Sequence, residues 1–226
     1  MCAGRIGRCS SIEDREQICA LLINLGVATL QQGNYKAAES SFKEALLLAR
    51  QIGHRYQISN LLLNLGFLSI MLIDYIKAIN YLEEGLLLAR QLEQRTLISA
   101  TLSNLGQVTR KVGNYAQADV YLQESLTIAR QSKSPYRICD ALCEYGDLQL
   151  DMNHIEAAEA TFLQICSIVS ERDHEALAQY GLARVMAAKG NLLEAIKWGE
   201  MSTKTLETMG HYAAKEARAW LTSITS

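Results

Sequence analysis

The chain has 226 residues, of which 49% are hydrophobic, and its 22 Lys and Arg against 24 Asp and Glu give a formal net charge of −2. This balance is typical of a folded soluble protein, and without a run of clustered Lys and Arg it argues against a nucleic acid partner. The most apolar run, residues 61–73, is too short and too often interrupted by polar residues to cross a membrane, so no membrane partner is expected either.

The start of the chain and its cysteines indicate the compartment. Residues 1–11 are polar and lack the apolar centre of a signal peptide, so we expect them to form an N-terminal tail. The six cysteines lie mostly within helical pattern and lack the spacing of a disulfide framework. Reduced thiols in a cytoplasmic protein are therefore predicted.

From residue 12 onward the sequence repeats itself with a period of 40. Asn24-Leu25-Gly26 recurs as Asn64-Leu65-Gly66, as Asn104-Leu105-Gly106 and, more loosely, as Glu144-Tyr145-Gly146. A fixed period of this size marks stacked supersecondary units, each too small to bury its own apolar face.

Each unit is predicted to be a pair of antiparallel helices. In the first unit, apolar residues at helical spacing precede the break at Gln32-Gly33-Asn34 and resume after it. Small residues at Gly26 and Ala38 let the two helices approach closely, and Leu25 and Phe42 are expected to fill the space between them. This pattern is typical of an αα-hairpin.

The order Leu22, Leu25-Gly26, Ala38, Phe42, Ala45 resembles the tetratricopeptide repeat, and the resemblance covers roughly residues 12–221. It implies an all-α fold, a right-handed α-solenoid of about five helix hairpins with a C-terminal capping helix. The expected units are residues 12–53, 54–93, 94–133, 134–173 and 174–210, followed by a cap at 211–226.

Two departures from the usual pattern point to a subclass. The unit has 40 residues instead of about 34, and Arg50, Arg90 and Arg130 replace the closing proline. Both features resemble the longer-helix arrays of kinesin light chains and of bacterial STAND-type regulators. The last unit and its amphipathic closing helix, residues 215–221, resemble the end of arrays in NB-ARC or LuxR-like STAND proteins.

In tetratricopeptide arrays the first helix of each unit lines the concave face, so the resemblance implies a binding groove there. We expect it to be lined by Ile23, Asn24, Val27, Leu63, Asn64, Phe67, Ile70, Ser103, Asn104, Gln107, Arg110, Asp140, Glu144, Asp147 and Asp151.

The asparagine row is the most suggestive part of this groove. An amide side chain offers two donors and one acceptor, which suits it to hold the backbone of an extended peptide. The alternative is that each Asn bonds a neighbouring helix and fixes the spacing of the units. Both interpretations stay open at the level of the sequence.

The two halves of the predicted groove differ in character. Its first half is apolar, with Phe67 among its members, and would be covered by a partner's apolar segment, by preceding repeats or by self-association. Its second half is acidic, because Asp140, Glu144, Asp147 and Asp151 share one helix face. Arg110 and Lys111 could neutralise this stripe, a basic ligand segment could bind it, or water could solvate it.

Catalysis and metal binding find little support in the sequence. Cys139 and Cys143 are one helical turn apart, but a metal site needs further ligands on a fixed frame. No nucleophile, oxyanion donor or nucleotide-binding glycine motif accompanies the paired carboxylates. We therefore expect no catalytic residue, no metal and no cofactor.

Three functional hypotheses follow. The first is a non-enzymatic interaction module that binds a peptide or partner segment, with an apolar anchor and a basic flank, in the concave groove. The second is the sensor arm of a larger STAND-type ATPase or transcription regulator. The third is a homo-oligomerisation scaffold that associates through an uncapped N-terminal edge.

Overall fold

The computed structural model describes residues 12–168 and 171–225, and this part of the chain forms eleven α-helices without any strand. The expected N-terminal tail, residues 1–11, lies outside the described residues. The helices are α1 (Ile12–Gln31), α2 (Tyr35–Ile52), α3 (Arg55–Met71), α4 (Tyr75–Gln91), α5 (Arg95–Lys111), α6 (Tyr115–Gln131), α7 (Pro135–Asp151), α8 (Ile155–Ile168), α9 (Arg172–Ala188), α10 (Leu192–Thr208) and α11 (Ala214–Thr225).

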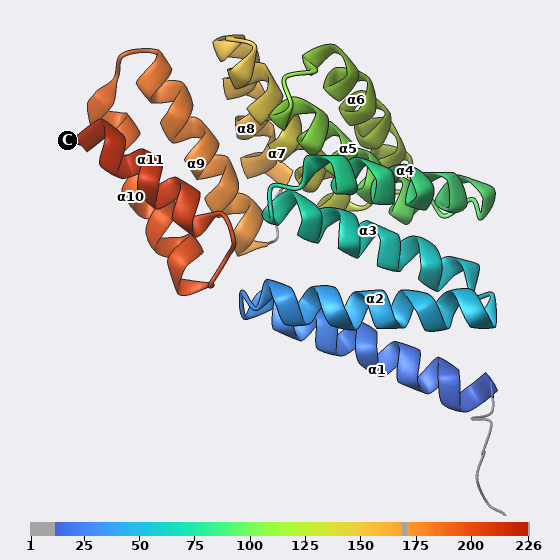
Figure 1. Ribbon diagram of the computed structural model, residues 1–226. Helices are drawn as coiled ribbons and strands as arrows, with labels where there is room; N and C mark the ends of the chain where they lie inside the picture. Colours follow the sequence, from blue (N-terminus) through green and yellow to red (C-terminus); the bar gives the residue numbers. More distant parts are fainter. Residues whose placement is uncertain (1–11, 169–170, 226) are drawn as a thin grey trace, which may run out of the picture.

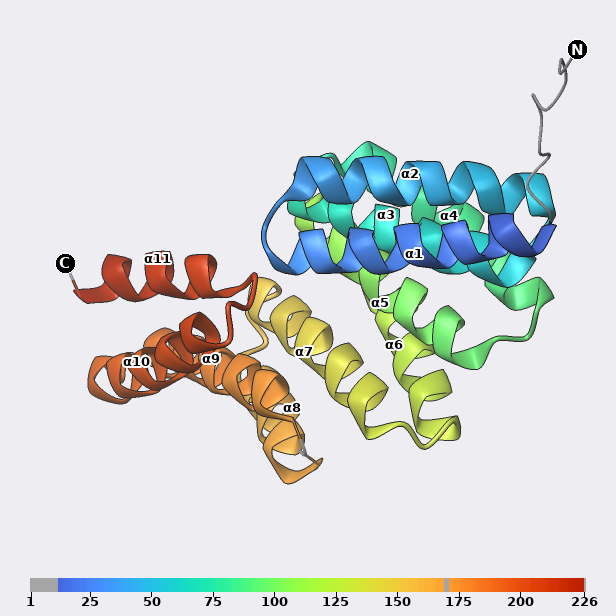
Figure 2. The ribbon, with the colours of Figure 1, turned by 90° about the horizontal axis from the view of Figure 1, so that it is seen from below.

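Consecutive helices pack as hairpins, and the hairpins stack in chain order (Figure 1). The array curves, so that α9, α10 and α11 lie across from the α1–α4 end (Figures 1 and 2). The predicted all-α solenoid of helix hairpins with a closing helix is thereby confirmed. The division of the chain into units at the particular residues given above stays a prediction.

The helix boundaries have local causes that recur along the chain. Asn34, Asp74 and Asn114 each precede a second helix of a hairpin and accept a hydrogen bond from a backbone N–H of its first turn. Ser134 does the same for α7, which begins with Pro135, the position where a helix tolerates proline best. The cap residues therefore set the period that the sequence shows.

A single packing motif joins the two helices of each of the first four hairpins. One large side chain of the second helix lies directly against a glycine of the first, where any Cβ would fall within 2.6 Å of it. The pairs are Phe42 on Gly26, Leu82 on Gly66, Leu122 on Gly106 and Phe162 on Gly146. The close approach predicted from the small residues is thus observed.

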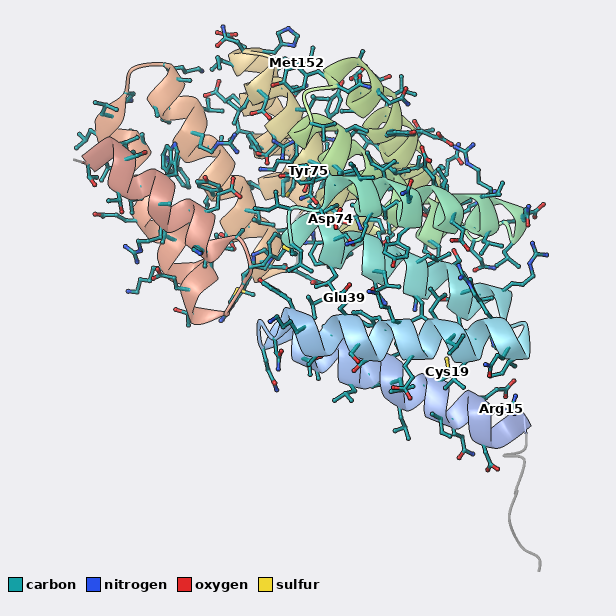
Figure 3. All side chains as sticks on the ribbon, viewed as in Figure 1. Arg15, Cys19, Glu39, Asp74, Tyr75 and Met152 are labelled. Carbon is teal, nitrogen blue, oxygen red and sulfur yellow. The ribbon has the colours of Figure 1, made fainter. Side chains whose placement is uncertain are left out.

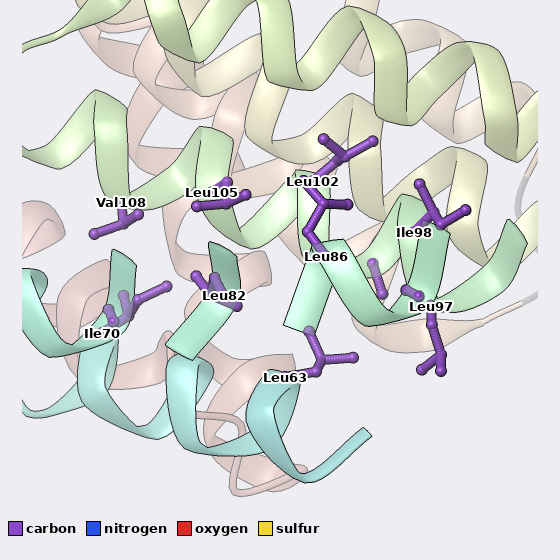
Figure 4. Packing of buried hydrophobic residues seen from close by; sticks show 12 residues of the cluster. Leu63, Ile70, Leu82, Leu86, Leu97, Ile98, Leu102, Leu105 and Val108 are labelled. Carbon is purple, nitrogen blue, oxygen red and sulfur yellow. The ribbon is translucent and has the colours of Figure 1, made fainter. Parts of the chain in front are cut away.

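The hydrophobic core runs continuously through the stack. Figure 4 shows Leu82 of α4 between Ile70 of α3 and Leu105 and Val108 of α5, all of them buried. Because each second helix packs against both its own hairpin and the next one, no hairpin buries its apolar face alone. In the described chain, no helix is both long and apolar enough to cross a membrane.

The described cysteines are free thiols in different surroundings. Cys19 of α1, labelled in Figure 3, is fully buried, and its Sγ lies 3.4 Å from the Ala45 carbonyl oxygen of α2. Cys139 is buried, Cys143 is half-buried and Cys166 is exposed. Burial raises the pKa of Cys19 and raises that of Cys139 to about 11, so both thiols stay protonated near neutral pH.

Candidate binding groove

The first helices of successive hairpins lie side by side on the inner face of the array, since α3 contacts α5, α5 contacts α7 and α7 contacts α9. Together with α11 they enclose a cavity of about 520 Å³. The apolar and aromatic lining comes from two parts of the fold: Ile70, Met71, Ile73 and Tyr75 belong to α3, α4 and the loop between them, and Leu177, Tyr180 and Tyr212 belong to α9 and the loop before α11. The polar lining comes from α5 and α7, with Gln107, Arg110, Lys111, Asp140, Glu144 and Asp147 together with Cys143.

Arg110 of α5 is the centre of the polar lining. Its side chain is only 4% exposed, and its guanidinium lies 2.7 Å from Asp151, 3.1 Å from Asp147 and 3.4 Å from Glu144. One cation therefore joins three carboxylates of α7 across the α5–α7 interface. Of the two cations proposed for this role, Lys111 instead lies 3.7 Å from Glu216 of α11.

A second arginine reaches the acidic stripe from the opposite side. Arg184 of α9 contacts Asp147 at 2.6 Å and Asp151 at 3.8 Å. Asp147 thus lies between two guanidinium groups. Burial raises the pKa of Asp147, but the charges of Arg184 and Arg110 outweigh burial and hold that pKa below its usual value.

Glu144 is the carboxylate with the weakest cationic partner. Its nearest charge is Arg110 at 3.4 Å, and Gln107 donates a hydrogen bond to it at 2.5 Å. Burial raises the pKa of Glu144 to about 7 in spite of Arg110. Within the described residues, Gln107 Oε1 and Arg110 Nε are buried without a hydrogen-bond partner beside this carboxylate.

Two members of the predicted apolar half belong to the groove and one lies in the core. Ile70 lines the cavity, and Phe67 packs against Tyr212, with ring centroids 5.5 Å apart. Leu63 packs among buried side chains of α4 and α5 (Figure 4), so it offers no free surface to a ligand. Ser103 is likewise buried, and its hydroxyl lies 2.9 Å from the Ser125 hydroxyl of α6.

The side-chain amides of the three asparagines make no hydrogen bonds to other described residues. The side chains of Asn64 and Asn104 are half-buried and that of Asn24 is exposed, and none of them makes a hydrogen bond within the described chain. No hydrogen bond among the described residues therefore supports the interpretation that these asparagines bond a neighbouring helix and fix the spacing of the units. The groove residues predicted on α1, namely Ile23, Asn24 and Val27, do not reach the cavity.

A separate cluster has the composition of a metal site. Glu171, Asp173 and His174 at the start of α9 place one ligand atom each within 4.8 Å of the others. The buried His174 ring packs against Tyr136 at 4.7 Å, and its Nδ1 lies 3.4 Å from Asp173. Cys139 and Cys143, which the sequence analysis discounted as a metal site, are not part of this cluster.

Arg184 and Tyr212 are site residues that the repeat register does not find. Successive first helices begin 40 residues apart from Arg55 to Arg95 and from Arg95 to Pro135, but α9 begins at Arg172, 37 residues after Pro135. The change shifts the last hairpin out of the period. Tyr212 lies in the loop before α11, where no repeat position predicts a groove residue.

Comparison with known proteins gives one family and several similar folds. The model of the family described as tetratricopeptide repeat matches residues 17–93 and 97–171. No curated protein matches the chain. BtubC (BKLC) from P. vanneervenii has a similar structure, with a TM-score of 0.68, 16% identity and 88% of both chains covered.

Two structures of Rap proteins in complexes are also similar in fold. The Rap conjugation gene regulator of plasmid pLS20, in complex with the Phr* peptide, has a TM-score of 0.77 and 16% identity over 97% of this chain. A Rap protein complexed with competence and sporulation factor has a TM-score of 0.75 and 15% identity over 87% of this chain. This chain spans 62% and 57% of those two proteins, respectively.

Proposed function

We propose that this chain, which belongs to the tetratricopeptide repeat family, is a non-enzymatic module that binds a peptide or partner segment in the groove formed by α3, α5, α7 and α9. The observation that carries the proposal is the cavity of about 520 Å³ at the centre of this groove. Its lining combines aromatic and aliphatic side chains with carboxylates, a composition that suits an amphiphilic segment.

The free amides of Asn64 and Asn104 would hold the backbone of the bound segment. Neither amide makes a hydrogen bond to another described residue, and a half-buried amide gains more from a ligand hydrogen bond than an exposed one does. None of the three asparagines lines the cavity itself, so they would hold parts of the segment that extend beyond it, with Asn24 of α1 at the end of the row.

Phe67 and Ile70 would contact an apolar anchor of the bound segment. Phe67 is half-buried, so it can lose further water contact on binding. Ile70 is only 5% exposed and would act as part of the cavity wall. Leu63 and Ser103 are left out of the proposed contact set because their side chains are buried and do not line the cavity.

The carboxylates of α7 would receive a basic flank of the segment. Asp147 and Asp151 each have two arginine partners, whereas Glu144 has one at 3.4 Å and Asp140 pairs with Arg137 of its own helix at 3.1 Å. We therefore assign the basic contact to Glu144 and Asp140. The Rap regulator of similar fold that is bound to the Phr* peptide supports peptide binding in general.

Selection of a displayed random peptide library against the purified chain tests the proposal. Selected peptides should carry a large apolar residue near a Lys or Arg, and Asn104→Ala or Glu144→Gln should weaken their binding about 5-fold or more. Asn80→Ala on the exposed surface of α4 is the matched control. Failure to select any peptide, or equal affinities for Asn104→Ala and Asn80→Ala, would contradict groove binding.

A second candidate, self-association, is favoured by the outer face of α1. Ile18, Leu21 and Leu25 lie at helical spacing and are 43%, 68% and 51% exposed, which is costly for apolar side chains in water. Sedimentation analysis should then show dimers that Leu21→Asp converts to monomers. A monomer at high protein concentration would exclude this candidate.

The wider STAND context stays a prediction. An immunoblot of the native protein in its own cells tests it, because a band well above 25.1 kDa would place the array in a larger regulator.

A further inference from the structure

One side chain from the far end of the chain lies across the groove. Tyr212, in the loop between α10 and α11, packs its ring edge-on against Phe67 of α3, with a centroid distance of 5.5 Å and an interplanar angle of 79°. A second contact joins the middle of the array to its C-terminal helix, because Lys111 of α5 and Glu216 of α11 lie 3.7 Å apart. These contacts link elements that are far apart in the sequence and are not neighbours in the stack.

The ring of Tyr212 contacts an apolar residue and borders the polar lining of the cavity. It borders the cavity together with Cys143 and Glu144 while its edge contacts Phe67. A neutral, aromatic and hydroxyl-bearing group therefore lies between Phe67 and the polar lining of the cavity.

The side chain of Tyr212 is held more loosely than its backbone. The next residue, Ala213, is buried against Tyr180 and Leu206, which fixes the loop, whereas Tyr212 itself remains 44% exposed. Its ring is retained by Phe67 and by His211, whose ring lies 4.2 Å away. An aromatic pair of this kind changes an equilibrium constant by only about 2- to 12-fold, so rotation of the side chain out of the groove is accessible.

We infer that Tyr212 is an internal plug, which occupies the position of the ligand's apolar anchor beside Phe67 and must swing out before a ligand can bind. This inference rests on the proposed groove function, since it assigns regulation to that site. A ligand whose anchor makes a better contact with Phe67 than Tyr212 does displaces the plug. Segments without such an anchor are excluded, because they cannot compensate for the lost ring contact.

Alkylation of Cys143 by N-ethylmaleimide tests the plug without any ligand. Cys143 borders the cavity beside Tyr212, and the exposed Cys166 of the same chain is an internal reference. Phe67→Leu keeps an apolar side chain but removes the ring contact, and it should accelerate labelling of Cys143 about 2- to 12-fold while Cys166 is unchanged. Tyr212→Ala should do the same, and the double variant should label no faster than Tyr212→Ala alone.

Two controls keep this experiment decisive. Tyr56→Ala removes a tyrosine of nearly equal exposure, 45% against 44%, from outside the cavity lining, and it should leave the Cys143 rate unchanged. Rapid labelling of the buried Cys19 would reveal unfolding, in which case Phe67→Met replaces Phe67→Leu. An unchanged Cys143 rate in a folded Phe67 variant overturns the plug.

Affinity measurements with a peptide selected on the wild-type chain then connect the plug to binding. Tyr212→Ala should tighten binding by about 2- to 12-fold through a faster association rate, and Tyr56→Ala should not. Weaker binding by Tyr212→Ala would make Tyr212 a ligand contact and refute the plug. If no peptide is selected at all, the proposed function fails, while the Cys143 rates still decide whether Tyr212 covers the groove.

Discussion

Replacing Arg110 by Met is expected to destabilise the protein by about 3 kcal/mol. Arg110 is 4% exposed and contacts three carboxylates, and removing one partner of a buried ion pair costs roughly 3–5 kcal/mol. The lower end applies because Arg184 continues to pair with Asp147 and Asp151. For a domain of this size, such a loss lowers the melting temperature by about 6–12 °C.

Arg90→Met is the matched control for this prediction. Arg90 also joins two hairpins through a carboxylate, at 2.7 Å from Glu124, but the two side chains are 50% and 40% exposed. Exposed ion pairs contribute about 0–1 kcal/mol, so the free energy of unfolding of Arg90→Met should lie within about 1 kcal/mol of the wild-type value. Urea titrations of the three proteins by circular dichroism measure the difference.

The pH dependence gives the Arg110 prediction a second readout. The Arg110 guanidinium lowers the pKa of both Glu144 and Asp147, so without it both carboxyls hold their protons to a higher pH in the folded protein than they do in the wild type. The stability deficit of Arg110→Met should therefore be largest near pH 8 and shrink as the pH falls towards 5. Equal losses for Arg110→Met and Arg90→Met, or a deficit that grows on acidification, would refute the proposed role of Arg110.

Three further substitutions test individual features. Gly181→Ala should cost about 1–3 kcal/mol in urea unfolding, because its Cβ would lie 2.3 Å from the Phe162 ring, and a neutral result would show that the ring moves freely. Ile73→Gly should stabilise the protein by about 1 kcal/mol in the same assay. Ile73 holds a φ of 61° at the position where Gly113 has a φ of 83°, so a loss of stability would mean that its side chain contributes packing. Glu144→Gln should remove a pH effect: burial raises the folded pKa of Glu144 to about 7, so its favourable contribution is present below pH 4.5 and is lost as the pH rises through 7. The unfolding free energy of this variant should fall less between pH 5 and 8 than that of the wild type, and parallel curves would exclude Glu144 as the titrating group.

The sequence predicted the fold because the determining interactions are local and repeated. The residues that cap the helices, such as Asn34 and Asn114, bond to the first turn of the helix that follows them. The pairing of Phe42 with Gly26 lies within one hairpin and recurs 40 residues later as Leu82 with Gly66. Periodicity and small residues are sufficient to predict such contacts.

The candidate groove was only partly predictable from the same pattern. The stripe from Asp140 to Asp151 and its partner Arg110 follow from helical spacing and repeat register. Leu63 was assigned to the groove, yet it lies in the core, because α3 is apolar around most of its circumference and periodicity cannot tell its faces apart.

The sequence by itself therefore determined the helices, the hairpins and the rows of side chains that the inner helices present. Only the tertiary structure decided which of these residues meet across the array. Arg184 reaches Asp147 because α9 follows α7 at a different spacing, and Tyr212 reaches Phe67 because the stack curves back on itself. Curvature is the sum of small rotations between neighbouring hairpins, each set by side-chain packing, so no local pattern contains it.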